Sequence, residues 1–207
     1  MTNTGQETEA KFFVKDLNRI RERLEQFAAR LIQARVLETN IRFDLPGARL
    51  HAEGRVLRLR RDTAARLTYK SASSNEQGVL SREEIEFVVE EFEKAKRFLE
   101  ALGYQKLVFY EKYRTTYELK DTHVMLDELP YGSFVEIEGD AFLSIRSVAD
   151  LLELNWDAAI ATSYHALFER VRRNMKSSLT DLSFADFAGL QVTAEDLEVL
   201  AADVSTY

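Results

Sequence analysis

The chain has 207 residues, of which 45% are hydrophobic and 11% aromatic, so it can bury a substantial core and is not disordered. It carries 28 lysines and arginines against 35 aspartates and glutamates, and this net charge of −7 argues against a broad nucleic-acid-binding surface. It contains no cysteine, which excludes disulfides, thiolate metal sites and cysteine nucleophiles. No apolar run is long enough to span a bilayer and the first residues are polar, so we expect a soluble cytoplasmic protein without a membrane partner.

The first predicted element is a strand over residues 6–14. In it Glu7, Glu9 and Lys11 occupy alternate positions just before the apolar run Phe12-Phe13-Val14. Alternate residues of a strand point to the same face, so these three charges share one side of the sheet. Taken alone, such a stretch is more typical of a solvated surface than of the lining of a site.

Two helices and seven further strands follow in the first two thirds of the chain. Apolar residues at three- and four-residue spacing predict a helix over residues 16–33, and a second helix is expected over 91–102, where Gly103 supplies a stop. The strands are expected at 35–44, 54–61, 65–71, 81–89, 106–119, 122–128 and 133–139. Eight strands and two helices predict an α+β fold whose antiparallel sheet curls or closes.

The last third of the chain is predicted to be helical. Helices are expected at 147–154, 157–176 and 194–202, and Ile160, Tyr164, Leu167 and Val171 mark an apolar face on the second. We therefore divide the chain into residues 1–142, which contain the sheet, and a C-terminal helical appendage over residues 143–207. Its acidic end is expected to be a solvated tail, and an exposed helical appendage is compatible with a homodimer.

The alternation of charged and apolar residues returns in nearly every predicted strand. Arginines and lysines concentrate on three strands, while acidic residues concentrate on others and small neutral polar residues are scarce. The alternating charged positions are Arg58, Arg60, Arg66, Lys70, Glu84, Glu86, Lys112, Arg114, Glu136 and Glu138. A sheet with one solvated face explains any single strand. If helices instead cover the apolar outside, the charged faces point inward and line a tunnel.

The charges of such a lining nearly cancel. The seven acidic residues Glu7, Glu9, Glu84, Glu86, Asp127, Glu136 and Glu138 face six basic residues, which leaves a charge of −1. A bound triphosphate would add about four negative charges. Clustered carboxylates are the hard ligands that Mg²⁺ or Mn²⁺ prefers, and arginine forks suit phosphate oxygens. The pattern therefore favours a metal-bound polyphosphate over a simple organic acid.

The ordered set of motifs resembles the CYTH family of triphosphate tunnel metalloenzymes, which includes class IV adenylyl cyclases and thiamine triphosphatases. The match covers about residues 6–139. It consists of Glu7-Thr8-Glu9-Ala10-Lys11, Leu57-Arg58-Leu59-Arg60, Thr68-Tyr69-Lys70, Glu84-Ile85-Glu86, Lys112-Tyr113-Arg114, Asp127-Glu128-Leu129 and Phe134-Val135-Glu136-Ile137-Glu138.

The resemblance implies an eight-stranded antiparallel β-barrel, the triphosphate tunnel, whose lining binds a triphosphate with Mg²⁺ or Mn²⁺. The implied metal ligands are Glu7, Glu9, Asp127, Glu136 and Glu138. The implied phosphate-binding residues are Lys11, Arg58, Arg60, Lys70, Lys112 and Arg114. Glu84 and Glu86 match supporting acidic positions that orient the basic residues. No general base is identified.

The shared motifs bind the triphosphate and do not report which bond reacts. Asp44-Leu45-Pro46 and the segment Ser163-Tyr164-His165-Ala166-Leu167 look more like the class IV cyclases, so conversion of ATP to cyclic AMP and pyrophosphate is the first interpretation. The alternative is a triphosphatase that acts on tripolyphosphate, thiamine triphosphate or a nucleoside triphosphate. A non-enzymatic alternative is a module that binds polyphosphate or nucleotides. Trp156 could stack on a base, although a packed core tryptophan is the commoner case.

Overall fold

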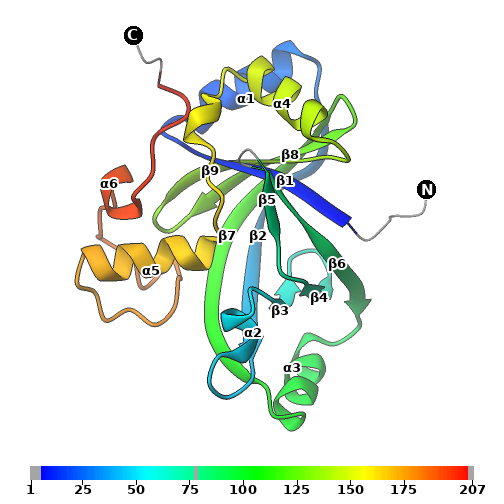
Figure 1. Cartoon of the computed structure of the whole chain (residues 1–207), viewed down its shortest axis with the longest axis vertical. Coiled ribbons are helices and arrows are strands. Elements are labelled where there is room, and N and C mark those ends of the chain that lie inside the picture. The colour runs from blue at the N-terminus through cyan, green and yellow to red at the C-terminus, as the bar shows by residue number, and fades with distance from the viewer. Residues whose placement is uncertain (1–5, 77–78, 205–207) are drawn as a thin grey trace.

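The structure is a computed structural model that describes residues 6–76 and 79–204 (Figure 1). The strands are β1 (Gln6–Val14), β2 (Arg30–Asp44), β3 (Val56–Arg61), β4 (Ala65–Lys70), β5 (Ser74–Glu76), β6 (Val79–Val89), β7 (Gln105–Leu119), β8 (Thr122–Leu129) and β9 (Gly132–Glu138). The helices are α1 (Leu17–Gln26), α2 (Arg49–Ala52), α3 (Phe92–Ala101), α4 (Phe142–Leu151), α5 (Tyr164–Asn174) and α6 (Ala194–Leu197), with a short 3-10 helix, η1 (Trp156–Ala158).

Eight antiparallel strands close into a ring, as the sequence predicts. The sheet order is β1-β9-β8-β7-β2-β3-β4-β6-β5, and β1 also pairs with β6. The ring therefore contains every strand except β5, a short strand that pairs only with β6 and falls in the predicted loop after Ser71. Closure gives the sheet an inner and an outer face, so each strand must place its two alternating sets of side chains on opposite sides.

Three apolar clusters cover the outside of the ring and one of its ends. Helices α1 and α4 pack against β1, β8 and β9, with Phe12 and Leu126 fully buried. Helix α3 covers β2, β3 and β4, where Leu99 meets Leu59. Helix α5 and the segments that follow it pack around Phe134. In Figure 1, α1 and α4 lie together at the top, α3 lies at the bottom and α5 lies at the left. The charged faces of the strands consequently point into the ring.

The predicted helix over residues 16–33 is wrong beyond Gln26. The chain turns at Ala28, which adopts a left-handed conformation with φ of 54°, and the backbone N–H of Ala29 donates to the carbonyl of Leu24. Such a left-handed residue ends a helix. Leu31, whose spacing fits the helical stripe, lies instead in β2 opposite Tyr117 of β7. Long-range strand pairing here overrides a local helical period.

The predicted helices of the last third are also corrected. Residues 159–163 are extended rather than helical, because Ala159 bridges to Phe12 and the Ile160 N–H donates to the Lys11 carbonyl at 2.8 Å. Helix α5 begins only after Ser163, whose hydroxyl accepts from the Ala166 N–H. The helix expected over residues 147–154 is observed earlier in the chain, as α4 at 142–151. The helix expected over residues 194–202 ends at Leu197, as α6. Edge pairing with β1 thus replaces the first turns of the predicted helix.

The acidic end of the chain is not a freely solvated tail. Asp203 is buried, and its carboxylate accepts hydrogen bonds from the backbone N–H groups of Lys15 and Asp16 at 2.8–3.0 Å. Asp181 lies 2.7 Å from the Lys106 ammonium and accepts from the Phe109 N–H. These contacts fasten the end of the chain to the start of α1 and to β7. Among the described helices, none combines the length and apolarity needed to cross a membrane.

Removing the Asp203 carboxylate should destabilise the fold. We expect Asp203→Ala to lower the free energy of unfolding by roughly 1.5–3 kcal/mol, since buried N–H groups lose a charged acceptor. Urea denaturation measures the change. The matched control is Asp150→Ala, which removes an exposed ion pair with Arg146 and should change stability by less than about 0.5 kcal/mol. Equal effects of both substitutions would contradict this role of Asp203.

Candidate active site

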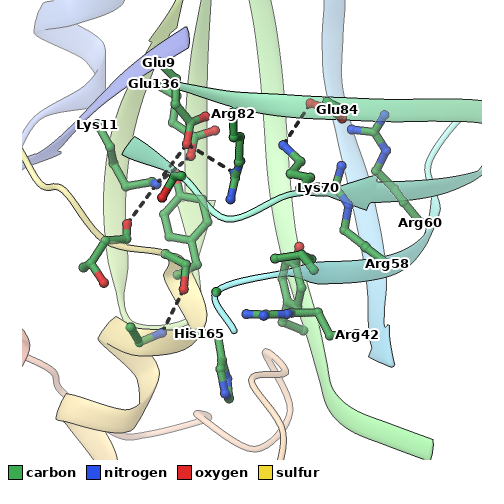
Figure 2. Close-up of a pocket in the computed structure, with 18 of the residues that line it drawn as sticks. Glu9, Lys11, Arg42, Arg58, Arg60, Lys70, Arg82, Glu84, Glu136 and His165 are labelled. Carbon is green, nitrogen blue, oxygen red and sulfur yellow. Dashed lines mark hydrogen bonds and ion pairs between the residues drawn. The ribbon is translucent and has the colours of Figure 1, made fainter. Parts of the chain in front are cut away.

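A cavity of about 760 Å³ lies inside the ring and is lined by charged side chains from the inner faces of the strands (Figure 2). The expected site residues that line it are Glu9, Lys11, Arg58, Arg60, Lys70, Glu84, Glu86, Lys112, Arg114, Glu136 and Glu138. Asp127 lies behind this lining and is fully buried. The backbone of Glu7 pairs with Arg82, but its side chain lies outside the described part of the structure. The ring therefore brings together the residues that the sequence singles out, apart from that side chain.

One end of the cavity contains a buried network of carboxylates and basic groups. Arg114 donates to Asp127 at 2.6 Å and also to Glu136. The Lys11 ammonium lies 3.1 Å from Glu136, and the Lys112 ammonium lies 2.9 Å from Asp127. Since every member has an oppositely charged partner, the network keeps several charges in a mostly buried wall.

The residues on β3, β4 and β6 form a second network. Arg60 donates to Glu86 at 2.8 Å, and Arg58 lies 3.6 Å from the same carboxylate. The Lys70 ammonium lies 3.1 Å from Glu84. Glu84 and Glu86 thus each contact a basic side chain at the cavity wall, and their supporting role stays a prediction.

The ionisation of the network follows from these contacts. Burial alone would raise the pKa of Glu136, but Lys11 and Arg114 hold it well below the usual value. Burial and the neighbouring Asp127 raise the pKa of Tyr164 well above its usual value, so its hydroxyl stays protonated and donates to Asp127 at 2.8 Å. At neutral pH Glu136 is therefore charged and Tyr164 is a neutral donor.

Several cavity residues are absent from the sequence-based set. Glu38 and Asn40 are completely or almost completely buried on β2, where Asn40 donates to Glu38 at 3.0 Å and Glu38 lies 3.7 Å from both Arg60 and Lys112. Arg42 on β2 and Arg82 on β6 line the cavity. The signal that could have found them is the same two-residue period, since Glu38, Asn40 and Arg42 alternate along one strand.

The appendage also contributes to the site. The Thr162 carbonyl accepts from the Lys11 ammonium at 3.2 Å, and the Tyr164 ring lies 4.5 Å from that ammonium. Residues 161–166 form part of the cavity wall. Tyr164 is thus both a buried core residue and a hydrogen-bond partner of the site. Trp156 packs between Phe12 and Phe142 in the outer core, so it is not a base-stacking surface in this cavity.

The charge of the lining differs from the near neutrality that the sequence predicts. Among the described residues, nine basic and five acidic side chains line the cavity, because Arg42, Arg55 and Arg82 add to the expected set. The buried carboxylates of Glu38 and Asp127 reduce this excess without cancelling it. A triphosphate carries about four negative charges at neutral pH. Charge balance therefore favours a polyphosphate even before any cation is considered.

The acidic residues fit a divalent cation that is shared with a ligand. No group of three metal-ligating side chains is close enough to hold an ion by itself within residues 6–76 and 79–204. Glu9 and Glu138 lie directly opposite each other in the β1–β9 register, and Glu136 is the next inward residue on β9. Because Mg²⁺ commonly takes one or two carboxylates together with substrate phosphates and water, this set suits such a shared site.

Comparison with known proteins agrees with this geometry. The sequence model of the CYTH domain matches residues 5–142. The chain belongs to the CYTH family. This family is in general one of metal-dependent triphosphate tunnel proteins. Here residues of the appendage, beyond the matched CYTH domain, complete the cavity wall. No curated protein sequence matches the chain significantly.

Solved structures share the CYTH fold at low sequence identity. A candidate adenylate cyclase from Vibrio parahaemolyticus is 19% identical with a TM-score of 0.71, over 80% of this chain and 99% of that one. A protein from Pyrococcus horikoshii OT3 is 23% identical with a TM-score of 0.66, over 76% and 96%. A candidate adenylyl cyclase from Hippeastrum, described as having a dominant triphosphatase activity, is 16% identical with a TM-score of 0.58, over 79% and 95%. At these identities the likeness shows the fold alone.

The buried Glu38 carboxylate should make stability depend on pH. Burial would raise the pKa of Glu38, but Lys112, Arg114 and Arg60 lower it far below 4.5. A carboxylate with a depressed pKa stabilises the fold above its unfolded pKa, and this stabilisation is lost as the pH falls further. We expect the free energy of unfolding of Glu38→Gln to decline less steeply below about pH 4.5 than that of the unmodified protein.

Chemical denaturation at pH 7, 4.5 and 3 measures this difference. The matched control is Glu93→Gln on α3, an exposed residue whose substitution should leave the slope unchanged. Parallel pH profiles for Glu38→Gln and the unmodified protein would show that the Glu38 charge does not contribute to stability.

Proposed function

We propose that this CYTH protein is a divalent-metal-dependent enzyme that hydrolyses the terminal phosphate of a triphosphate bound in its cavity. The observation that carries the proposal is the convergence of nine basic and five acidic side chains inside one closed ring. Arginine and lysine bind phosphate oxygens, while carboxylates bind the cation that accompanies a polyphosphate. The family membership supports triphosphate processing, and the choice of bond is our inference.

Six residues would bind the phosphates, namely Lys11, Arg58, Arg60, Lys70, Lys112 and Arg114. Their carboxylate partners hold them at the cavity wall before the substrate enters, as in the 2.9 Å contact of Lys112 with Asp127. Donors that are fixed in advance need little rearrangement when negative charge shifts in the transition state, which is the main source of electrostatic catalysis. The rigidity of the two networks would therefore serve the reaction as well as the fold.

Glu7, Glu9, Glu136 and Glu138 would hold Mg²⁺ or Mn²⁺. The bound ion would polarise a phosphoryl oxygen and neutralise developing charge. Asp127 has both oxygens engaged by Lys112, Arg114 and Tyr164, so in this structure it would act mainly by positioning those groups. Glu9, Glu136 and Glu138 line the cavity and could meet an ion that arrives with the substrate.

Hydrolysis is preferred over cyclisation because the two cyclase-like segments have structural roles here. Asp44 accepts hydrogen bonds from the backbone N–H groups of Leu45, Leu50 and His51, and so fastens α2 to the end of β2. Tyr164 supports Asp127. Cyclisation of ATP remains the second candidate, because the His51 and His165 rings, 5.4 Å apart at the cavity wall, offer flat groups to a nucleobase.

Product analysis separates the candidate reactions. The protein is incubated with tripolyphosphate, thiamine triphosphate or ATP, each with Mg²⁺ or Mn²⁺ and with a chelator control. We expect orthophosphate from at least one substrate, and none with the chelator. Cyclic AMP with pyrophosphate from ATP would establish cyclisation instead. Tight binding without turnover, unaffected by the chelator, would establish a binding module.

Substitution of a cavity carboxylate tests the proposed site. Glu136→Gln keeps the side-chain shape but removes a charge that faces Lys11 and Arg114, so we expect turnover to fall at least about 100-fold. The matched control, Glu93→Gln on the exposed surface of α3, should retain activity. Melting temperatures confirm that both variants are folded. Retention of activity by folded Glu136→Gln would refute the assignment of this carboxylate.

A further inference from the structure

Arg42 is a buried cation in the cavity that makes no direct contact with an acidic side chain in the described part of the chain. Arg42 is 7% exposed. Within the described ranges 6–76 and 79–204, its guanidinium has no hydrogen-bond or ion-pair partner. Each of the other eight basic residues of the lining has an acidic partner, for example Arg82 with Glu9 at 3.8 Å. Figure 2 shows Arg42 extending from the wall toward the middle of the cavity. A buried charge without a partner is costly, so this position is poised to receive an anion.

The nearest acidic side chain does not fill this role. Asp44, two residues along β2, uses its oxygens to accept three backbone N–H groups at the start of α2. The charged neighbours of Arg42 in the cavity are instead positive. Burial lowers the pKa of Arg42; Tyr110 and Asp44 act in the opposite direction, but the like charges of Arg82 and Arg58 add to the lowering, and the pKa stays below its usual value. The local field thus adds to the need for a negative ligand.

Register places Arg42 next to the proposed triphosphate-binding residues. Arg42 on β2 lies directly opposite Arg58 on β3, and directly opposed residues on one face of a sheet have Cβ atoms about 5 Å apart. A phosphate chain that reaches Arg58 would therefore meet Arg42 with its next phosphoryl group. A phosphoryl group has several oxygens and a double negative charge. It therefore matches two guanidinium groups better than a ligand with a single carboxylate would.

His165 completes this part of the wall. Burial, together with the charge of Arg42, lowers the pKa of His165 to about 3, so the ring is neutral at pH 7. Its Nδ1 atom is buried and has no hydrogen-bond partner in the described structure. A neutral imidazole can donate to a phosphoryl oxygen without adding a further positive charge. Figure 2 places His165 on the same side of the cavity as Arg42.

We propose that Arg42, together with Arg58 and His165, forms a fourth phosphoryl-binding position at the α2–α5 end of the cavity. It would take either the additional phosphate of a chain longer than three or an orthophosphate beside a bound triphosphate. This inference rests on the proposed function, because the position is defined relative to a triphosphate. The cavity of about 760 Å³ falls within the range that encloses whole small-molecule ligands.

Calorimetric titration tests the position without turnover. Linear tetraphosphate and tripolyphosphate are titrated separately into the protein in the presence of a chelator. We expect the unmodified protein to bind tetraphosphate at least about tenfold more tightly, since one more charge-assisted contact forms. In Arg42→Gln the ratio of the two dissociation constants should fall to about one. Arg42→Lys, which keeps the charge but not the fork, should retain part of the preference.

The matched control is Arg49→Gln, which removes the same charge from the exposed surface of α2 and should keep the unmodified ratio. Tripolyphosphate titrated with added orthophosphate distinguishes the source: tighter binding in the unmodified protein but not in Arg42→Gln identifies a free orthophosphate. A ratio near one in the unmodified protein, without an effect of orthophosphate, overturns the proposal. ATP is titrated as a third ligand, and a loss of affinity in Arg42→Gln that is confined to ATP also overturns the proposal, because it would make Arg42 a nucleoside contact.

The two proposals can fail separately. The titration reports binding in the absence of metal, whereas the proposed function is tested by products formed in its presence. A protein that forms no product but prefers tetraphosphate through Arg42 would lose the enzymatic proposal and keep the fourth position. A protein that hydrolyses tripolyphosphate but does not prefer tetraphosphate would keep the enzymatic proposal and lose the fourth position.

Discussion

Backbone pairing of β1 with β9 on one side and with β6 on the other closes the sheet, and the cavity depends on this closure. An open sheet could leave its charged face in water at little cost. A closed one encloses that face, so the charges must be neutralised by one another or by a ligand. Packing of the outer apolar faces against α1, α3 and α4 fixes which face points inward, since those apolar faces then lie outside the charged interior.

The enclosed charges are arranged as paired networks. Arg114 is held by Asp127 and Glu136, while Arg60 is held by Glu86 and lies near Glu38. Such pairs add little net stability when buried, but losing one partner is strongly destabilising. Their more general consequence is rigidity, because each donor is already oriented before a substrate arrives. Arg42 differs because it contacts no acidic side chain in the described structure, and we propose that a further anion binds there.

The appendage belongs to the site in physical terms. Its extended segment pairs with β1, so the Thr162 carbonyl reaches Lys11 and helix α5 starts where Tyr164 can bond to Asp127. A continuous helix over residues 157–176 would have removed the pairing of Ile160 with Lys11. The end of the chain, through Asp203, then fixes the start of α1. Segments that are distant in sequence thus hold one wall of the cavity.

The sequence by itself determined which residues share a face, because the two-residue period of strands groups Glu9 with Lys11 and Arg58 with Arg60 whatever the fold. It also favoured a polyphosphate over a simple organic acid as the ligand, since arginine forks and carboxylates share the charged faces. Only the tertiary structure decided that these faces point inward, because direction depends on closure and on what covers the outside. It alone assigned Leu31 to a strand and, among the residues that the structure describes, left Arg42 without a direct acidic contact, since both outcomes depend on neighbours that local periodicity does not specify.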